Sequence, residues 1–516
     1  MSHSQIDLPH AISAKLQVDG KSIDALVTIS DGSLEATLTS VDYFNTDFKN
    51  QKFVSGITAD RKCICLMGII VKRGCGRSIN FVGERSSWSS VLTAQFLAIS
   101  DCVFEPTTSN ISGAYILNDQ ISQICHDPST LTSVIDPQAA INALASAQLI
   151  EVDGSETGWK SDVQVKLDKG NSFEAIIASG SVLGVPAFPS LSFSTERRLI
   201  DNRYVVGIKF SELTDFYDTL TKCITMVRLC EFSYGIEIVL ERLQLTRPDI
   251  TRVIEDNKKE YSNLVDVYFF DLGFGTRRVS QDSWRSSRLG DWRDALVAPA
   301  RNRTEFENVI TNWFKTEPDK SEARARLLDG YRNGSSFPAD RLIGACAAFE
   351  LLPEDSKPTK QTPQAVLDLA ECLKQSINNS SLDLDWKDRF KGQLGRVKSI
   401  STREVIEHRL NKIRYSDSDF LPDCELVLGH AVKLRNRLIH GSPTKLPESE
   451  NIRFQPFFTS ILEVIFVFSE LMECGYDIKD WGKANYPQCN PLAMTIGEFD
   501  LQVKSLKEAL ASHQTS

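Results

Sequence analysis

The hydrophobic pattern of this chain changes its period once, and that change limits the folds open to it. Up to about residue 303, apolar and polar residues alternate over short segments, which is typical of strands with one buried face. From residue 304 onward, apolar residues recur every three or four positions, as in amphipathic helices. A chain of 516 residues is too long for one ordinary core. We predict an α+β, multidomain protein with a β-rich N-terminal region before an all-α C-terminal region.

The N-terminal region is predicted to contain antiparallel sheets and one long helix. Alternating segments separated by Asp19-Gly20 and Asp31-Gly32 predict a three-stranded meander at its start, since these dipeptides form tight turns. The helix, over 213–231, repeats apolar residues at helical spacing and should cover a sheet face. The predicted strands are 12–18, 23–29, 34–38, 63–71, 172–177, 204–210, 236–243 and 264–270.

The C-terminal region is predicted to be an up-and-down bundle of five or six helices. Ser401 and Glu404 have the spacing of a capping box and predict one helix start. Two helical segments precede a Gly-Ser-Ser breaker at 334–336. We therefore expect a β-rich domain over 1–303, a helical connector over 304–335 and a helical bundle over 336–516. The predicted helices are 308–314, 320–331, 342–352, one from Pro363, one from Ser401, 423–440, 456–472 and 500–511.

The most informative motif is Leu-Arg-Asn-Arg-Leu-Ile-His-Gly at 434–441, which sets Arg435 and His440 five residues apart near a helix end. An imidazole exchanges protons near neutral pH, and a guanidinium stays charged and can fork onto phosphate oxygens. Asn436 adds a group that could orient a phosphate or the imidazole. These residue types suit RNA cleavage. The alternative is a surface Arg and His whose positive charge favours a helix C-terminus.

Spacing alone does not identify this site, because Arg403 to His408 repeats it with acidic residues inside. The surrounding pattern distinguishes the two matches. The helix from Asp423, an acidic N-cap candidate, carries an apolar stripe, and at about 100° per residue Asn436 and His440 fall on the opposite side. His440 is therefore not placed as a core histidine. The stripe is Val427, Ala431, Leu434 and Leu438, with Arg435 at its edge and Gly441 ending the helix.

Basic residues gather in two places although the chain is acidic, with a net charge of −10. Residues 387–414 contain nine Lys or Arg and three acids, which an RNA backbone would favour, although solvated helix faces also look like this. Residues 277–303 contain seven Arg with Trp284 and Trp292 among them, which suits either stacking on single-stranded RNA or a domain junction. The Gly273-Phe-Gly275 sequence is weak as a nucleotide loop and indicates a turn.

The sequence gives less direct evidence on cellular location and on metal binding than on the fold. The N-terminus lacks the features of a secretory signal, and residues 454–472 are interrupted by Gln and Glu, so we expect a buried helix, no membrane span and a cytoplasmic protein. The twelve cysteines show no paired framework, which fits a reducing compartment. Cys63, Cys65 and Cys75 could bind zinc, but no partner at finger spacing accompanies them, so we expect neither a metal nor a cofactor.

Taken with its order along the chain, the motif resembles the ApeA family of bacterial anti-phage proteins, which carry a C-terminal HEPN domain. The resemblance rests on Arg435-Asn436-x3-His440-Gly441, on the Asn-Trp-Phe stretch ending at Phe314 and on the helix Arg-Leu-Ile-Gly-Ala-Cys-Ala-Ala-Phe-Glu-Leu-Leu at 341–352. It covers most of the chain in order. Only the helical third carries specific residues, and the N-terminal likeness is one of layout.

The resemblance implies a metal-independent RNase in which Arg435, Asn436 and His440 are catalytic and Glu350 is an auxiliary group. It further implies a homodimer through the HEPN domain, because cleavage needs groups on both sides of the phosphorus and each chain supplies one such His. The substrate would be host RNA, with tRNA as the expected target, cut after a phage-derived trigger, so that growth stops. A different class of function remains open, a catalytically silent HEPN scaffold that binds a nucleotide or a protein. The expected RNA-binding residues are Lys398, Arg403, Arg409, Lys412, Arg414 and Arg437.

Overall fold

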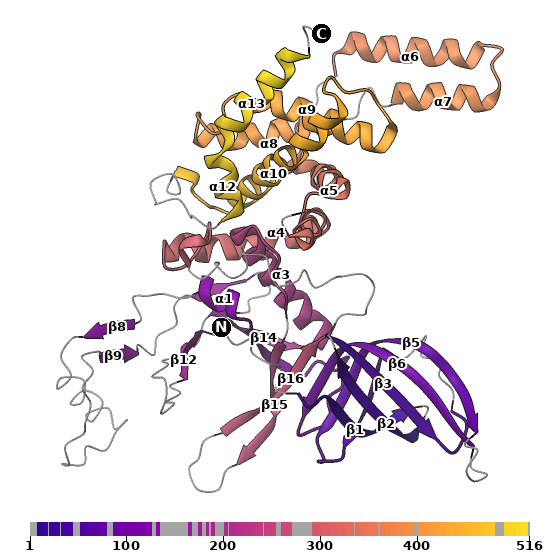
Figure 1. Cartoon of the computed structure of the whole chain (residues 1–516), viewed down its shortest axis with the longest axis vertical. Helices are drawn as coiled ribbons and strands as arrows, with labels where there is room; N and C mark the ends of the chain where they lie inside the picture. The colour runs from indigo at the N-terminus through magenta and orange to yellow at the C-terminus, as the bar shows by residue number, and fades with distance from the viewer. Residues whose placement is uncertain are drawn as a thin grey trace. The chain divides into compact units, whose positions relative to one another are not determined.

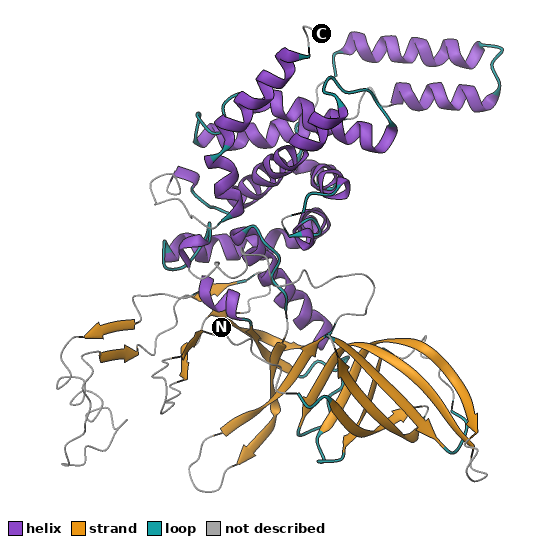
Figure 2. Ribbon diagram, viewed as in Figure 1, coloured by secondary structure: helices purple, strands orange, loops and turns teal. Residues whose placement is uncertain are grey.

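The chain forms two compact units in the computed structural model (Figure 1). We call Met1–Ser233 with Ile238–Lys315 the β-rich unit, and Tyr234–Glu237 with Thr316–Ser516 the helical unit. The division falls inside the connector predicted over 304–335. The predicted α+β class, with β-rich structure first and helices after it, is confirmed (Figure 2). The structure describes residues 8–18, 20–30, 32–44, 52–79, 86–125, 131–134, 164–167, 174–177, 182–184, 187–190, 201–204, 206–240, 242–253, 260–270, 292–334, 336–359, 362–395, 400–479 and 490–513.

Six strands of the β-rich unit form a closed sheet. They run in the order β6-β3-β2-β1-β4-β5, and β5 pairs back with β6 to complete the ring. All their pairings are antiparallel, and the predicted meander of the first three strands is confirmed, with Ala14 opposite Ala25 in the first pair. The strands are β1 (Ala11–Val18), β2 (Lys21–Ser30), β3 (Ser33–Ser40), β4 (Phe53–Thr58), β5 (Cys63–Ile79) and β6 (Ser86–Ser100).

Alternation along these strands fills the interior of the closed sheet with apolar side chains. In β1 every second residue is buried, so that Leu16 and Val18 point inward while their neighbours face outward. Leu38 of β3 and Leu66 of β5 join them in one hydrophobic cluster. The interior is therefore packed by side chains.

The second half of the sheet extends from β6 and carries a long helix, α3 (Phe216–Tyr234). Phe216, fully buried at the start of that helix, meets the rings of Phe96 and Phe104 edge to face, with centroids 5.5 and 6.1 Å away. The predicted helix over 213–231 therefore exists, three residues later, as α3 (Phe216–Tyr234). The added strands, in spatial order, are β16 (Glu260–Phe269), β15 (Arg242–Val253), β7 (Ile111–Leu117), β14 (Val206–Thr214), β11 (Val182–Gly184) and β10 (Glu174–Ile176).

One strand prediction is wrong in this unit, and several strands were not predicted. The strand predicted over 236–243 is wrong, because α3 continues to Tyr234 and ends at Gly235 (φ 69°), after which the chain enters β15 only at Arg242. The long strand β6 was not predicted, because Leu92, Thr93 and Ala94 are all buried and the alternation disappears there. The remaining short elements are α1 (Asp119–Ile124), β8 (Leu131–Val134), β9 (Gln164–Leu167), β12 (Ala187–Ser190), β13 (Asp201–Tyr204) and η3 (Trp292–Asp294).

The helical unit is built around one long apolar helix, α10 (Glu448–Glu473). It contacts α5, α8, α9, α12 and α13. Between residues 339 and 513 the described residues form eight α-helices, more than the five or six predicted, because α7 and α12 were missed. The other helices are α5 (Ala339–Glu350), α6 (Gln364–Asn379), α7 (Leu384–Gly395), α8 (Thr402–Ser416), α9 (Cys424–His440), α12 (Pro491–Gly497) and α13 (Phe499–Ser512), with short turns η4 (Tyr331–Asn333) and η5 (Glu354–Ser356).

Two helices continue through prolines where the sequence suggests a break or a start. The segments predicted over 308–314 and 320–331 belong to one helix, α4 (Arg303–Leu328), with Pro318 inside it. Helix α10 begins eight residues before Pro456, which the prediction took as its start. A proline removes one intrahelical hydrogen bond, and burial of the flanking residues holds the helix across that gap.

One described helix, α10, is long and apolar enough to cross a membrane by length and composition alone. Its most apolar window is 78% buried inside the helical unit, where Phe458, Ile461 and Phe466 have no exposed surface. The prediction that 454–472 is a buried helix is confirmed. Its apolar residues are buried by packing against neighbouring helices.

Candidate active site at the end of α9

Helix α9 presents the motif at the point where it leaves the core. Val427, Ala431 and Leu434 are buried as predicted, whereas Leu438 is 39% exposed, contrary to its assignment to the core stripe. The reason is that the last turn extends past the packed helices, so its apolar residues Leu438 and Ile439 face outward with His440. Asp423 is the N-cap residue, but its side chain makes no capping hydrogen bond.

The C-terminus of α9 is fixed by a glycine. Gly441 adopts a left-handed conformation (φ 69°), and its N–H donates to the carbonyl of Arg437 at 2.8 Å. An L side chain rarely adopts this conformation, so the glycine ends the helix directly after His440. The sequence prediction of this helix end is confirmed.

Arg435 forms an ion pair with Glu350, the last residue of α5. Its Nη2 donates to Oε1 of Glu350 at 2.7 Å, and its Nη1 donates to Oδ1 of Asn436 at 3.1 Å. The hydroxyl of Thr402, at the start of α8, donates to the same oxygen of Glu350. Helices α5, α8 and α9 contact one another, so one carboxylate links all three. We call Glu350, Thr402, Arg435 and Asn436 the arginine cluster.

The guanidinium of Arg435 is held at the edge of the core. Its side chain is 17% exposed, and the side chain of Glu350 is 39% exposed. Its Nε is buried and has no hydrogen-bond partner in the part of the chain that the structure describes. Cys346 lies one turn before Glu350, and burial raises the pKa of its thiol to about 12 despite the nearby positive charge of Arg435. The thiol is therefore neutral, and the guanidinium is the charge that this cluster can offer to a ligand.

His440 is exposed and lies one turn after Asn436 on α9. Residues four apart on a helix are neighbours on one face, so the imidazole is on the same side as the amide of Asn436. Among the described residues, no hydrogen bond or ion pair engages His440. The ring is therefore available to a ligand, while the arginine cluster beside it is held by internal contacts.

The basic residues expected to bind RNA are mostly paired with acids. Nε of Arg403 donates to Glu407 at 2.7 Å, and Nζ of Lys412 donates to Glu473 at 2.6 Å. Likewise, Arg414 pairs with Glu425, and Arg437 pairs with Glu448. Lys398 lies outside the described residues. The excess of cations in the sequence therefore does not become an equal excess of unpaired positive charge on the surface.

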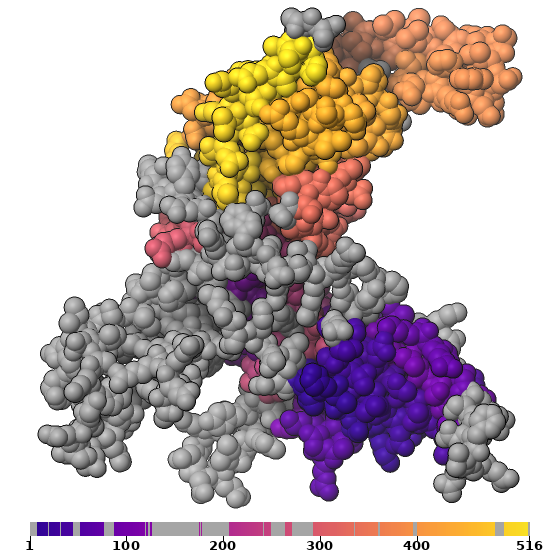
Figure 3. Space-filling view, in the orientation of Figure 1, coloured from indigo at the N-terminus to yellow at the C-terminus, as the bar shows by residue number. Residues whose placement is uncertain are grey.

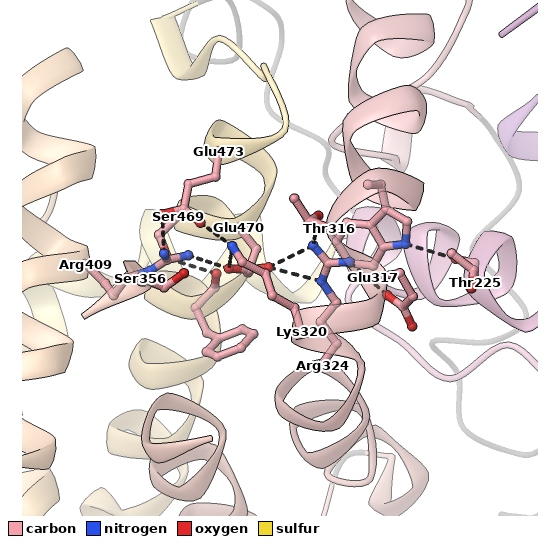
Figure 4. Close-up of polar contacts among 12 residues, drawn as sticks. Thr225, Thr316, Glu317, Lys320, Arg324, Ser356, Arg409, Ser469, Glu470 and Glu473 are labelled. Atoms are coloured by element: carbon pink, nitrogen blue, oxygen red, sulfur yellow. Dashed lines mark hydrogen bonds and ion pairs between the residues drawn. The ribbon is translucent and has the colours of Figure 1, made fainter. Parts of the chain in front are cut away.

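Arg409 does not lie on an RNA-facing surface, because its side chain is completely buried. Its Nη2 donates to Glu470 at 2.6 Å and its Nε to the hydroxyl of Ser469 at 2.9 Å, both on α10 (Figure 4). Burial alone would lower the pKa of Arg409, but the carboxylates of Glu470 and Glu473 outweigh it and raise the pKa. The expected RNA-binding role is incorrect for this residue, which is part of the core.

The same ionic core includes two cations from α4. Glu470, which is fully buried, accepts from Lys320 at 2.9 Å and from Arg324 at 3.0 Å, in addition to Arg409 (Figure 4). Burial would raise the pKa of Glu470, but Arg409, Arg324 and Lys320 outweigh it and lower the pKa. A second buried pair, Arg341 with Glu463, joins α5 to α10 through two hydrogen bonds of 2.7 and 2.9 Å. The periodicity of the sequence gives no sign of these pairs, because it reports apolar positions.

The second Arg-x4-His match has a different environment. His408 is partly buried on α8, and burial, followed by the charges of Lys412 and Arg409, lowers its pKa. Arg403 in this match pairs with Glu407 within its own helix. The capping box predicted at Ser401 and Glu404 is confirmed, with both reciprocal hydrogen bonds present. This match therefore lies in a regular, capped helix that runs on through His408 to Ser416.

Thr402 and Cys346 were not identified as site residues from the sequence. Thr402 follows the capping serine of α8, so the sequence indicates only an ordinary helix start there. Cys346 has the pattern of an apolar core residue. Only the contact of α5 with α8 and α9 places them beside Glu350 and Arg435. No local sequence signal distinguishes them.

The remaining candidate sites from the sequence gain no support from the described residues. Within the described ranges, no group of three or more His, Cys, Asp or Glu side chains could hold a metal ion. Cys65 is buried in β5, where burial raises its pKa to about 12 and Ser55 donates to its sulfur at 3.7 Å. Residues 273–275 and the run from 277 to 291 lie outside the described residues.

Comparison with known proteins gives no match to this chain, whether against family models, curated proteins or solved structures.

Proposed function

We propose that this protein is a metal-independent endoribonuclease of the HEPN type that acts in bacterial defence against phage. The observation that carries the proposal is the arrangement of Arg435, Asn436 and His440 at the exposed end of α9, with Arg435 held by Glu350. A charged guanidinium, an amide and an available imidazole stand together on one helix end. The resemblance of the motif to the ApeA family supplies the reaction class.

The proposed reaction is attack of a ribose 2′-hydroxyl on the adjacent phosphate. The new P–O bond forms as the bond to the 5′-oxygen of the next nucleotide breaks, which leaves a cyclic phosphate and a 5′-hydroxyl. His440 transfers a proton in this step, a role typically worth roughly 10² to 10⁴ in rate. Arg435 stabilises the negative charge that builds on the phosphate oxygens. Asn436 orients the phosphate or the imidazole.

A second copy of the chain completes the proposed site. One proton leaves the attacking hydroxyl while another reaches the departing oxygen on the opposite side of the phosphorus. Each chain contributes one His440 to these two positions, so we propose a homodimer in the cytoplasm. The substrate we propose is host RNA, with tRNA as the proposed target and cutting triggered by a phage component through the β-rich unit.

The test uses purified full-length protein and total bacterial RNA in EDTA. Wild type, His440→Ala and His408→Ala are compared, because His408 has the same spacing from an arginine but a different environment. A parallel set of reactions receives extract from phage-infected cells to supply a trigger. Fragment ends are then mapped chemically.

The proposal expects cyclic phosphate ends from wild type and from His408→Ala, and none from His440→Ala. Equal cutting by wild type and His440→Ala would assign the activity to another site or to a contaminant. No cutting by any protein, with or without infected extract, would exclude the RNase and favour the second candidate.

The second candidate is a catalytically silent HEPN scaffold that binds a nucleotide or a protein. One observation favours it, the pairing of Arg403, Arg414 and Arg437 with acids, which leaves less positive charge for a long RNA. A scaffold that binds one nucleotide needs fewer cations than an RNA-binding surface. Calorimetric titration of wild type and Arg435→Ala with ATP distinguishes this candidate, since nucleotide binding without RNA cleavage would support it.

A further inference from the structure

Helices α6 and α7 form an antiparallel pair that projects from the rest of the helical unit, and we call this pair the arm (Figures 1 and 3). Both helices are fully described, and Ala370 is their only buried residue. Each contacts chiefly the other. The arm therefore has almost no core of its own within one chain.

The arm exposes large apolar side chains from both helices. Val366, Leu369 and Leu373 recur at helical spacing on α6, so they form one stripe. On α7, Trp386 and Phe390 are four residues apart and therefore lie on one side of the helix. The set of these side chains, which we call the arm face, comprises Val366 (39%), Leu369 (59%), Leu373 (43%), Trp386 (50%) and Phe390 (46%).

Such a pair needs a partner for its stability. Isolated helices shorter than about 12–15 residues are marginal in water, and most helix stability in proteins comes from burying an apolar face. Helix α7 has 12 residues and falls in that range, and α6, with 16 residues, buries only Ala370. Grouped exposed apolar side chains on soluble proteins also mark interaction sites. Both arguments predict that something covers the arm face.

The charges on the arm favour a second arm as that partner. Helix α6 carries two acids and one base, Asp368, Glu371 and Lys374, for a net charge of −1. Helix α7 carries three bases and two acids, for a net charge of +1. A two-fold axis that sets α6 of one arm against α7 of another therefore places opposite charges together at both contacts.

We propose that the arm face packs against the arm face of a second copy of this chain, so that two arms form an intermolecular four-helix bundle. The two-fold symmetry makes every contact occur twice and closes the assembly at a dimer. This inference rests on the proposed function in one respect, since it identifies the surface that joins the homodimer proposed above. Self-association itself can be measured without any RNA.

Cys372 provides a native reporter for this contact. It is exposed on α6 three residues after Leu369, at the edge of the arm face. A second arm would cover its thiol. Alkylation of Cys372, followed by peptide mass spectrometry, should therefore slow as the protein concentration rises through the dimer dissociation constant.

The test measures self-association by analytical ultracentrifugation of the full-length protein. In the variant Leu369→Asp/Leu373→Asp, two carboxylates enter the arm face, so the dimer dissociation constant should rise by about 30-fold or more. Leu501→Asp on α13 is the matched control, because Leu501 is 69% exposed and lies outside the arm. It should dimerise as wild type does. Circular dichroism of each variant checks that the helices remain folded.

Each outcome decides the proposal. A dimer that is lost in the arm variant and kept in the control, together with concentration-dependent protection of Cys372, supports it. A monomeric wild type, or a dimer that the arm variant leaves unchanged, overturns it. Protection of Cys372 at all concentrations in a monomer would show that another segment of the same chain covers the arm face, and would also overturn it.

The same samples separate this inference from the RNase proposal. His440→Ala should still dimerise, because it leaves the arm unchanged, although it removes the proposed proton donor. Failure of the arm variant to lose the dimer while His440-dependent cutting persists would reject the arm contact alone. A dimer through the arm without RNA cleavage would reject the RNase alone.

Discussion

The carboxylate of Glu350 accepts a hydrogen bond from Nη2 of Arg435 at 2.7 Å, although the two residues are 85 positions apart in the chain. This contact ties the end of α5 to the last turns of α9. Thr402 of α8 donates to the same oxygen, so three helices determine where the guanidinium lies. The charge proposed to meet the phosphate is therefore positioned by residues that do not belong to the motif.

Replacing Glu350 by Gln should reduce RNA cleavage without unfolding the protein. The change removes the charge that holds Arg435, and misplacement of a positioned catalytic group costs up to about 100-fold in rate. The pair is partly exposed, so the free energy of unfolding should change by no more than about 1 kcal/mol. Initial cleavage rates and urea unfolding of the variant check both statements. Glu354→Gln, in an exposed pair with Lys357, should leave both unchanged, and an unchanged rate in Glu350→Gln would show that Arg435 needs no such anchor.

Leu434→Ala and His440→Ala should affect the protein in opposite ways. Leu434 is buried against the core, so truncation should lower the free energy of unfolding by about 2–5 kcal/mol. His440 is exposed, so its replacement should change stability by less than about 0.5 kcal/mol while abolishing cleavage. Urea unfolding followed by circular dichroism compares them. Similar losses of stability in the two variants would contradict the placement of His440 outside the core.

Replacing Glu470 by Gln should strongly destabilise the helical unit. The change keeps the size of the side chain but leaves Arg409, Arg324 and Lys320 without their shared buried carboxylate. Breaking a buried ion pair on one side costs about 3–5 kcal/mol. The measurement is the free energy of unfolding of the variant compared with wild type. Glu371→Gln, on the exposed face of α6, is the matched control. A loss no larger than that of the control would mean that water or a rearrangement compensates the buried cations.

Acid should destabilise the helical unit through Glu473. Burial would raise the pKa of this carboxyl, but Arg409 and Lys320 outweigh it and hold the pKa well below its ordinary range. In the unfolded chain the Glu473 carboxyl has an ordinary pKa of about 4.3. As the pH falls, the unfolded chain therefore binds a proton at this carboxyl before the folded chain does. The stabilisation is present above that value and is lost as the pH falls toward the folded-state pKa.

The urea midpoint of the helical transition should thus decrease from about pH 6 to about pH 3. Glu473→Gln removes this titrating group, so its midpoint should start lower and vary less over the same range. A wild-type midpoint that is flat in acid would contradict the linkage. An equal slope in the variant would assign the acid sensitivity to other carboxyls.

The sequence by itself determined the local features of this protein. Alternation over 12–18 and helical spacing over 427–434 specify which side of each segment is buried, because side chains point in directions set by the backbone period. The capping box at Ser401 and the glycine at 441 specify helix ends for the same local reason. These signals are sufficient for the α+β class and for the helix that presents the motif.

Only the tertiary structure decided which distant residues meet. The pairing of Glu350 with Arg435 and the burial of Arg409 against Glu470 depend on how α5, α8, α9 and α10 pack, and a charged residue has the same local pattern whether its partner is water or a carboxylate. The exposure of Leu438 has the same origin, since an apolar residue is buried only where a neighbouring helix covers it. Periodicity defines a face, and packing decides what lies against that face.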